Sequence, residues 1–255
     1  MAGRARAPRR ACFAIVISGL FSLSTAAQSP AENGAFARRN SFGVFAAYSN
    51  DSSRILLGTA DQRKLVEFGA NYDRRLLMNH VVNWQYSVEL LPVALESDPL
   101  GRAVDHQISP TSLTQTYSVS PPLSCAPQTQ SYSYVDSKGV THTGTLTFFC
   151  HGREWTIGEA MSPVGFEWNF RPNHPLQPFL VGHGGYMYST RPIPEPFAGS
   201  FNFTFDFGAG LELYRTRRQS VRAEYRYHHI SNHGTASDNP GIDSGVFQVT
   251  YVFGR

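Results

Sequence analysis

Residues 201–207 read FNFTFDF, and this stretch decides the fold class. Successive side chains of a β-strand point to opposite faces, so a phenylalanine at every second position gives one apolar face and one polar face. The same alternation recurs along almost the whole chain, whereas no segment keeps apolar residues at the i, i+3, i+4, i+7 spacing of a helix. The sequence therefore predicts an all-β protein.

Eight segments carry the alternation at lengths near those of strands that cross a membrane at a tilt, and aromatic residues gather near their ends. The connections alternate between short and long, as in outer-membrane barrels with short periplasmic turns. We therefore predict an eight-stranded antiparallel transmembrane β-barrel, with a ten-stranded count left open. A soluble sandwich gives similar alternation and is the alternative. The predicted strands are 42–48, 64–72, 81–91, 157–170, 178–188, 201–214, 220–229 and 245–253.

The seventh predicted strand alternates apolar residues with a polar face that carries Arg222, Glu224 and Arg226. Charges on one strand face belong either to a polar barrel interior or to a solvated surface. The alternation alone leaves both positions open.

The N-terminus has the pattern of an export signal. Four of the first ten residues are arginines, an apolar run follows over residues 11–23, and small residues end at Ala27. We predict a signal peptide over residues 1–27, because the apolar run is too short to span a bilayer. Without these arginines, 18 basic residues face 19 acidic ones, which leaves no net basic excess for the phosphates of nucleic acid. Residues 28–255 are then expected to form a barrel in the outer membrane of a Gram-negative cell.

A long insertion, residues 92–156, separates the third and fourth predicted strands on the extracellular side. Within it, strands 130–135 and 140–149 flank a turn at residues 136–139. Cys125 and Cys150 lie symmetrically about this turn, so we predict that they form a disulfide across the base of a hairpin in an exported protein. The insertion could cap an acyl groove or bind a sugar or a partner, and its composition leaves these roles open.

Near the C-terminus, His229 and Ser231 are two residues apart and share one face of a strand. A base beside a hydroxyl is what nucleophilic catalysis requires, since neutral serine is a weak nucleophile. Asp243 opens the next strand, where a carboxylate could orient the imidazole. All three belong to the apolar face, so the candidate triad points toward lipid at the loop end of the barrel. Interfacial polar residues near a strand end are the alternative, and Asp238 is a second candidate acid.

Histidines in the same region also suggest metal ligation. However, His228 and His229 are adjacent on a strand and point to opposite faces, so they cannot easily share a site with His233 and Asp238. We predict no metal and no other cofactor.

The segment HISNHG at residues 229–234, followed by Pro240-Gly241-Ile242-Asp243, resembles the outer-membrane lipid A 3-O-deacylases, also called acyloxyacyl hydrolases. The likeness extends loosely over residues 166–253. It implies an eight-stranded barrel with a Ser-His-Glu triad on its outer wall, which removes an ester-linked (3-hydroxy)acyl chain from lipid A of lipopolysaccharide.

The roles implied by this resemblance fall on individual positions of the motif. Ser231 takes the place of the nucleophile, His229 that of the general base, and Asp243 that of the orienting glutamate, although it is one methylene shorter. Asn232 and Gly234 fall in the stretch that the family uses for its oxyanion hole. The insertion of 65 residues departs from the compact members of the family.

The expected function is thus a carboxylic ester hydrolase of the outer membrane. It acts on lipopolysaccharide in the outer leaflet, and the barrel is expected to be membrane-embedded, with a homodimer left open. Two other functions remain: a non-enzymatic barrel that binds a partner through its long loop, and a barrel phospholipase.

Overall fold

The computed structural model describes residues 36–50, 54–120 and 124–255, and the predicted signal peptide lies outside these ranges. In the described residues, no helix is long and apolar enough to cross a membrane. The regular structure there is strand, which confirms the all-β prediction. The strands are β1 (Asn40–Ser49), β2 (Lys64–Met78), β3 (Val82–Ser109), β4 (Leu113–Val119), β5 (Gln128–Val135), β6 (Thr141–Phe170), β7 (Leu176–Ser189), β8 (Phe201–Thr216), β9 (Gln219–Ser231) and β10 (Ile242–Gly254).

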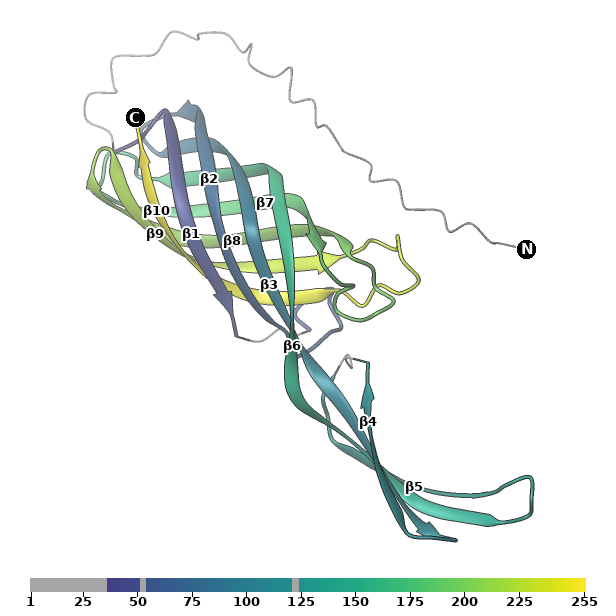
Figure 1. Cartoon of the computed structure of the whole chain (residues 1–255). Helices are drawn as coiled ribbons and strands as arrows, with labels where there is room; N and C mark the ends of the chain where they lie inside the picture. The colour runs from purple at the N-terminus through teal and green to yellow at the C-terminus, as the bar shows by residue number, and fades with distance from the viewer. Residues whose placement is uncertain (1–35, 51–53, 121–123) are drawn as a thin grey trace, which may run out of the picture. The chain divides into compact units, whose positions relative to one another are not determined.

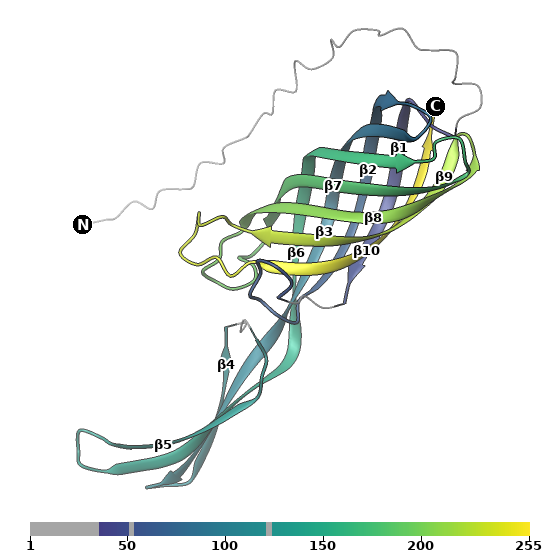
Figure 2. The ribbon, with the colours of Figure 1, turned by 180° about the vertical axis from the view of Figure 1, so that it is seen from behind.

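These strands form one antiparallel sheet in the order β4-β3-β2-β1-β10-β9-β8-β7-β6-β5. A further pairing of β3 with β6 closes the sheet into a ring, so β4 and β5 lie outside the closed barrel (Figures 1 and 2). Closure satisfies the backbone hydrogen-bonding groups that an open edge would leave unpaired, which a lipid environment requires.

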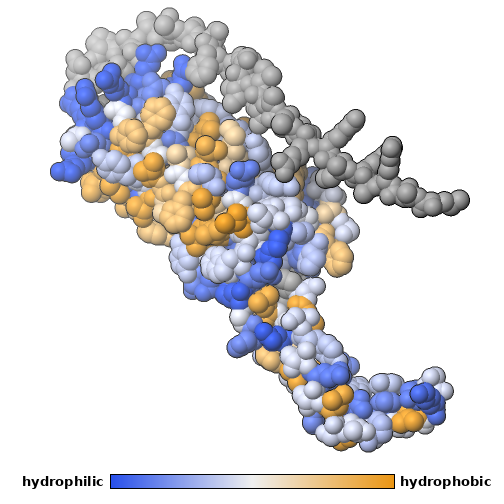
Figure 3. Space-filling model, viewed as in Figure 1, coloured by the Kyte–Doolittle hydropathy of each residue, from blue (hydrophilic) through white to orange (hydrophobic). Residues whose placement is uncertain are grey.

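The FNFTFDF stretch shows which face meets which environment. Its phenylalanines are 36–51% exposed on the outer wall, whereas Asn202, Thr204 and Asp206 are buried inside the barrel. Figure 3 shows apolar side chains gathered over the barrel wall. The apolar face is therefore the outer one.

The charged face of β9 lies in the barrel interior. Arg222 lies 2.9 Å from an Asp73 carboxylate oxygen and 2.8 Å from one of Glu167. Arg226 pairs in the same way with Glu89 and Glu224. Burying an unpaired charge is costly, so these ion pairs allow the barrel to be filled by polar side chains. The interior position, which the sequence left open, is the observed one.

The insertion is built differently from the prediction, because β3 and β6 run without interruption out of the barrel. We expected strand β3 to end near residue 91, but it continues through Pro92 to Ser109. A register shift between Leu91 and Ala94 marks a bulge at Pro92, and bulges are among the places where a strand tolerates proline. The pairing with β2 ends at Ser97, opposite Lys64.

Beyond Ser97 and its partner Trp155, β4 and β5 add to the outer parts of β3 and β6. We call this four-stranded sheet the arm. The predicted disulfide between Cys125 and Cys150 is present in it, with Cα atoms 5.6 Å apart.

Candidate active site

The register of three neighbouring strands positions the candidate triad. On β10, Asp243 lies directly opposite His229 of β9. On β8, Phe205 lies opposite His229 and Phe203 opposite Ser231. Both phenylalanines are exposed on the outer wall, so the His229 and Ser231 side chains belong to the outward face at the loop end of β9.

His229 and Asp243 are in direct contact, with 2.6 Å between His229 Nδ1 and Asp243 Oδ1. Both side chains are buried. An ionised carboxylate only accepts hydrogen bonds, so the shared proton is on Nδ1, and in the neutral ring Nε2 is then an acceptor. This is the tautomer that a general base requires.

The Asp243 carboxylate accepts three further hydrogen bonds. The backbone N–H groups of Leu56 and Leu57 donate to Oδ2 over 2.7 and 2.9 Å, and the Tyr227 hydroxyl donates to Oδ1 over 2.7 Å. Hydrogen bonds to an ionised acceptor are among the stronger ones in proteins. The acid is therefore held in one orientation from both of its oxygens.

Leu56 and Leu57 belong to the β1–β2 loop, which lies against the β9–β10 loop. Thr59 donates its hydroxyl to Pro240 O over 2.8 Å, and Ala60 forms a parallel bridge with Ile242. A Cβ placed on Gly58 would be 2.6 Å from Asp243 N, so only glycine permits this approach. These donors could not be predicted from the sequence, because backbone N–H groups leave no residue-type signal.

Ser231 is half-buried at the end of β9. Its hydroxyl makes no hydrogen bond to His229 or to any other residue that the structure describes. The structure thus brings His229 and Asp243 together and leaves Ser231 on the same face without a direct bond to the base. Such a bond is often long or absent before substrate binds.

The two residues expected at an oxyanion hole form the start of the β9–β10 loop. Asn232 donates its backbone N–H to Asn239 Oδ1 over 3.0 Å, and Gly234 donates its own to Asn232 Oδ1 over 2.8 Å. The Asn232 amide also donates to Asp238 O over 2.6 Å. The second candidate acid, Asp238, uses its carboxylate to accept the Asn239 N–H over 2.8 Å. Both expected donors are thus engaged within the loop.

The histidines considered as metal ligands are separated by the barrel wall. His228 faces the interior, where it lines a small cavity with Glu89 and Asp206. His229 faces outward, and the His233 ring lies edge-on to Phe203 with centroids 6.2 Å apart.

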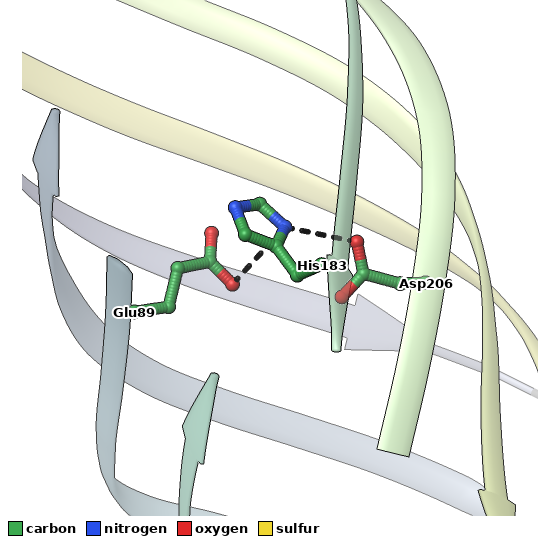
Figure 4. Close-up of side chains that lie close together, drawn as sticks. All are labelled: Glu89, His183 and Asp206. Carbon is green, nitrogen blue, oxygen red and sulfur yellow. Dashed lines mark hydrogen bonds and ion pairs between the residues drawn. The ribbon is translucent and has the colours of Figure 1, made fainter. Parts of the chain in front are cut away.

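A different cluster in the interior has ligand-type side chains within 4.8 Å of one another: Glu89, His183 and Asp206 (Figure 4). His183 Nδ1 lies 3.1 Å from Asp206 Oδ1 and 3.8 Å from Glu89 Oε2. However, Arg226 Nη1 lies 3.0 Å from the same Glu89 oxygen and 3.4 Å from the same Asp206 oxygen. The guanidinium group therefore already occupies the carboxylate oxygens that a cation would use.

Comparison with known proteins gives one family. A family model described as lipid A 3-O-deacylase (PagL) matches residues 119–252. No curated protein matches the chain. Among solved structures, the chain is similar to the crystal structure of the outer membrane enzyme PagL, with 14% identity, a TM-score of 0.48, and coverage of 84% of this chain and 99% of that one.

Two further solved structures are similar to the chain at lower scores. Neisserial surface protein A has 12% identity and a TM-score of 0.39, with coverage of 85% and 97%. LpxR from Salmonella typhimurium has 7% identity and a TM-score of 0.25, with coverage of 84% and 100%.

Proposed function

The chain belongs to the lipid A 3-O-deacylase (PagL) family, and on this basis we propose that it hydrolyses the 3-O-linked acyl ester of lipid A with Ser231 as nucleophile, His229 as general base and Asp243 as orienting acid. The protein is an outer-membrane lipid A deacylase with a β-barrel fold. The acyl position and the roles of the three residues are the proposed part.

One observation carries the assignment of residues: the His229–Asp243 pair on the outer wall, with Ser231 two residues further along the same strand face. Asp243 is held by four hydrogen bonds, and two of them come from a loop far away in the sequence. A carboxylate with this degree of preorganisation keeps the imidazole in one tautomer and stabilises the imidazolium that forms during reaction.

In the first half of the reaction, His229 Nε2 removes the proton from Ser231 Oγ as this oxygen attacks the ester carbonyl carbon. The carbonyl π electrons move to the oxygen, which becomes an oxyanion. When the intermediate collapses, the ester C–O bond breaks, and the sugar hydroxyl leaves with the proton from His229.

In the second half, water attacks the acyl-serine. His229 takes a proton from the water and returns it to Ser231, and the fatty acid is released. Each oxyanion requires donors close to Ser231. We assign this role to Asn232 and Gly234, whose N–H groups must exchange their partners within the loop when substrate binds.

The position of the site favours a substrate that arrives through the membrane. Phe203 and Phe205, which lie opposite Ser231 and His229, are 45% and 36% exposed on the outer wall. Lipid tails already cover this wall in the membrane, so an acyl chain reaches it by lateral diffusion, which contributes the positioning of the ester beside Ser231. Soluble esters in water lack this contribution, so we expect low turnover on them.

Mass spectrometry of lipid A tests the proposal. The wild type, Ser231→Ala and His229→Asn are expressed in a lipopolysaccharide-bearing host, with Ser237→Ala as the matched control. Ser237 lies in the β9–β10 loop, which follows Ser231, and its hydroxyl donates to the Phe197 carbonyl over 3.3 Å.

We expect lipid A to lose one 3-hydroxyacyl unit with the wild type and the control, and to stay intact with the other two variants. Activity retained by Ser231→Ala contradicts the mechanism. Intact lipid A together with released phospholipid fatty acids identifies a phospholipase instead.

A further inference from the structure

The arm is a single layer of sheet with both faces uncovered. Every residue of β4 is exposed, and β5 is exposed apart from Tyr132. A sheet ordinarily buries at least one face against another layer. An uncovered face with exposed side chains is available for contact with a ligand.

One face of the arm presents aromatic rings, and we call it the tyrosine face. The strand registers place Tyr134 opposite His142, Tyr132 opposite Gly144, and Tyr117 opposite Ala103 on this face. The Tyr134 and His142 rings are stacked, with centroids 4.9 Å apart and planes 5° from parallel. Tyr134 is 54% exposed and Tyr117 is 44% exposed. These rings form flat platforms open to solvent.

The polar groups around these rings are almost all uncharged. The Tyr132 hydroxyl donates to Asp105 over 2.8 Å, and this bond raises the pKa of Tyr132 to about 12, so the phenol stays neutral. Between residues 113 and 149 the only charged side chains are Asp136 and Lys138, both in the hairpin turn, and the arm segment of β3 adds Asp105 to this face and Arg102 to the other. Tyrosine with amide and hydroxyl side chains supplies rigid contact area together with adaptable hydrogen bonds. This chemistry fits a neutral polyhydroxylated ligand, because sugar rings stack their C–H faces on aromatic planes and share hydroxyl hydrogen bonds.

The arm is joined to the loop that holds the catalytic acid. Asp98, just beyond the last barrel pair of β3, accepts from Arg63 Nε over 2.8 Å, and both side chains are buried. Arg153 of β6 donates to Ser97 O over 2.6 Å and also to Gln62 O. Residues 62 and 63 continue the loop that supplies the Leu56 and Leu57 donors. The arm and the active site therefore lie at the same end of the barrel.

We propose that the tyrosine face of the arm, formed by Tyr117, Tyr132, Tyr134 and His142, binds the saccharide of the lipopolysaccharide molecule whose lipid A is bound at Ser231. This inference rests on the proposed function. The saccharide is attached to lipid A and extends away from the membrane, so it emerges at the end of the barrel that carries the arm.

The test compares Tyr134→Ala with Val135→Ala on two substrates. Val135 is the neighbouring residue on the opposite face and is 63% exposed, so it is a matched control for the loss of an exposed side chain. Deacylation is measured on complete lipopolysaccharide and on free lipid A, which lacks the saccharide. We expect Tyr134→Ala to lower kcat/KM on lipopolysaccharide about tenfold, as for an aromatic ring that the bound ligand covers. Turnover of free lipid A should stay unchanged.

Calorimetric titration of the purified protein with saccharide freed of lipid A provides a readout that does not depend on catalysis. The proposal is supported if the saccharide binds to the wild type and to Val135→Ala but not to Tyr134→Ala. If this pattern is found while neither substrate is deacylated, the proposed function fails and the saccharide site stands. The saccharide proposal is overturned if Tyr134→Ala lowers kcat/KM equally on both substrates. It is also overturned if the wild type does not bind the saccharide, or if Tyr134→Ala changes only the oligomeric state.

Discussion

Replacing Asp243 with asparagine tests whether this residue is the orienting acid, because the structure determines how the amide must lie. One carboxylate oxygen accepts from the N–H groups of Leu56 and Leu57, and the other accepts from Tyr227 and His229. If the amide nitrogen faced the two backbone donors, both would lose their acceptor, at about 1–3 kcal/mol each. The amide oxygen therefore stays on the loop side, and the amide nitrogen faces His229.

This orientation of the amide switches the His229 imidazole to the other tautomer. The amide nitrogen donates to His229 Nδ1, so the ring proton moves to Nε2, which can then no longer accept a proton from Ser231. The corresponding substitution in serine protease triads lowers kcat about 10⁴-fold. We expect a loss of about 10³–10⁴-fold here, which equals about 4–5.5 kcal/mol in activation free energy.

The assay measures kcat for lipid A deacylation by the purified variant in detergent, with far-UV circular dichroism to verify the fold. Asp238→Asn is the control, because that exposed carboxylate accepts the Asn239 N–H within the β9–β10 loop and is not hydrogen-bonded to His229. We expect the control to stay within about threefold of the wild type. Full activity in Asp243→Asn, or loss in Asp238→Asn alone, would refute the reasoning.

Three further variants probe the support of the site and of the arm. Tyr227→Phe removes one hydrogen bond to the acid, and we expect kcat to fall about tenfold with KM unchanged, as steady-state kinetics would show. An unaltered kcat would mean that the Leu56 and Leu57 donors suffice. Gly58→Ala places a Cβ 2.6 Å from Asp243 N, so the loop must move; we expect at least about a tenfold loss in kcat with an unchanged circular dichroism spectrum. Replacing both Cys125 and Cys150 with serine opens a covalent link across 25 residues, which is worth about 3.5 kcal/mol. Limited proteolysis of the arm should then accelerate while free lipid A turnover stays constant, and equal proteolysis rates would contradict this.

Local alternation was enough to predict the class of fold. A period of two in stretches such as FNFTFDF makes one face apolar wherever the strand pairs, and this is a property of the strand itself. The same alternation places His229 and Ser231 on one face. It could not tell whether the polar face of Arg222 and Arg226 met water or the barrel interior, because only closure of the ring between β3 and β6 creates an interior.

The insertion shows why boundaries were less predictable. Pro92 predicts a strand end from sequence, since proline cannot donate to a ladder. In the structure, a bulge lets β3 pass this residue and continue into the arm. The pairing of Cys125 with Cys150 was predictable, because both cysteines flank a single local turn.

For the candidate site, the sequence by itself determined the residue types and their spacing, from His229 to Ser231 along one strand. The tertiary structure decided which donors hold Asp243, because two of them are backbone N–H groups of Leu56 and Leu57, 187 and 186 residues away. Every non-proline residue carries a backbone N–H, so the sequence does not reveal which residues donate to the carboxylate. Only the path of the folded chain, with Gly58 lying against Asp243, brings those two N–H groups to the carboxylate.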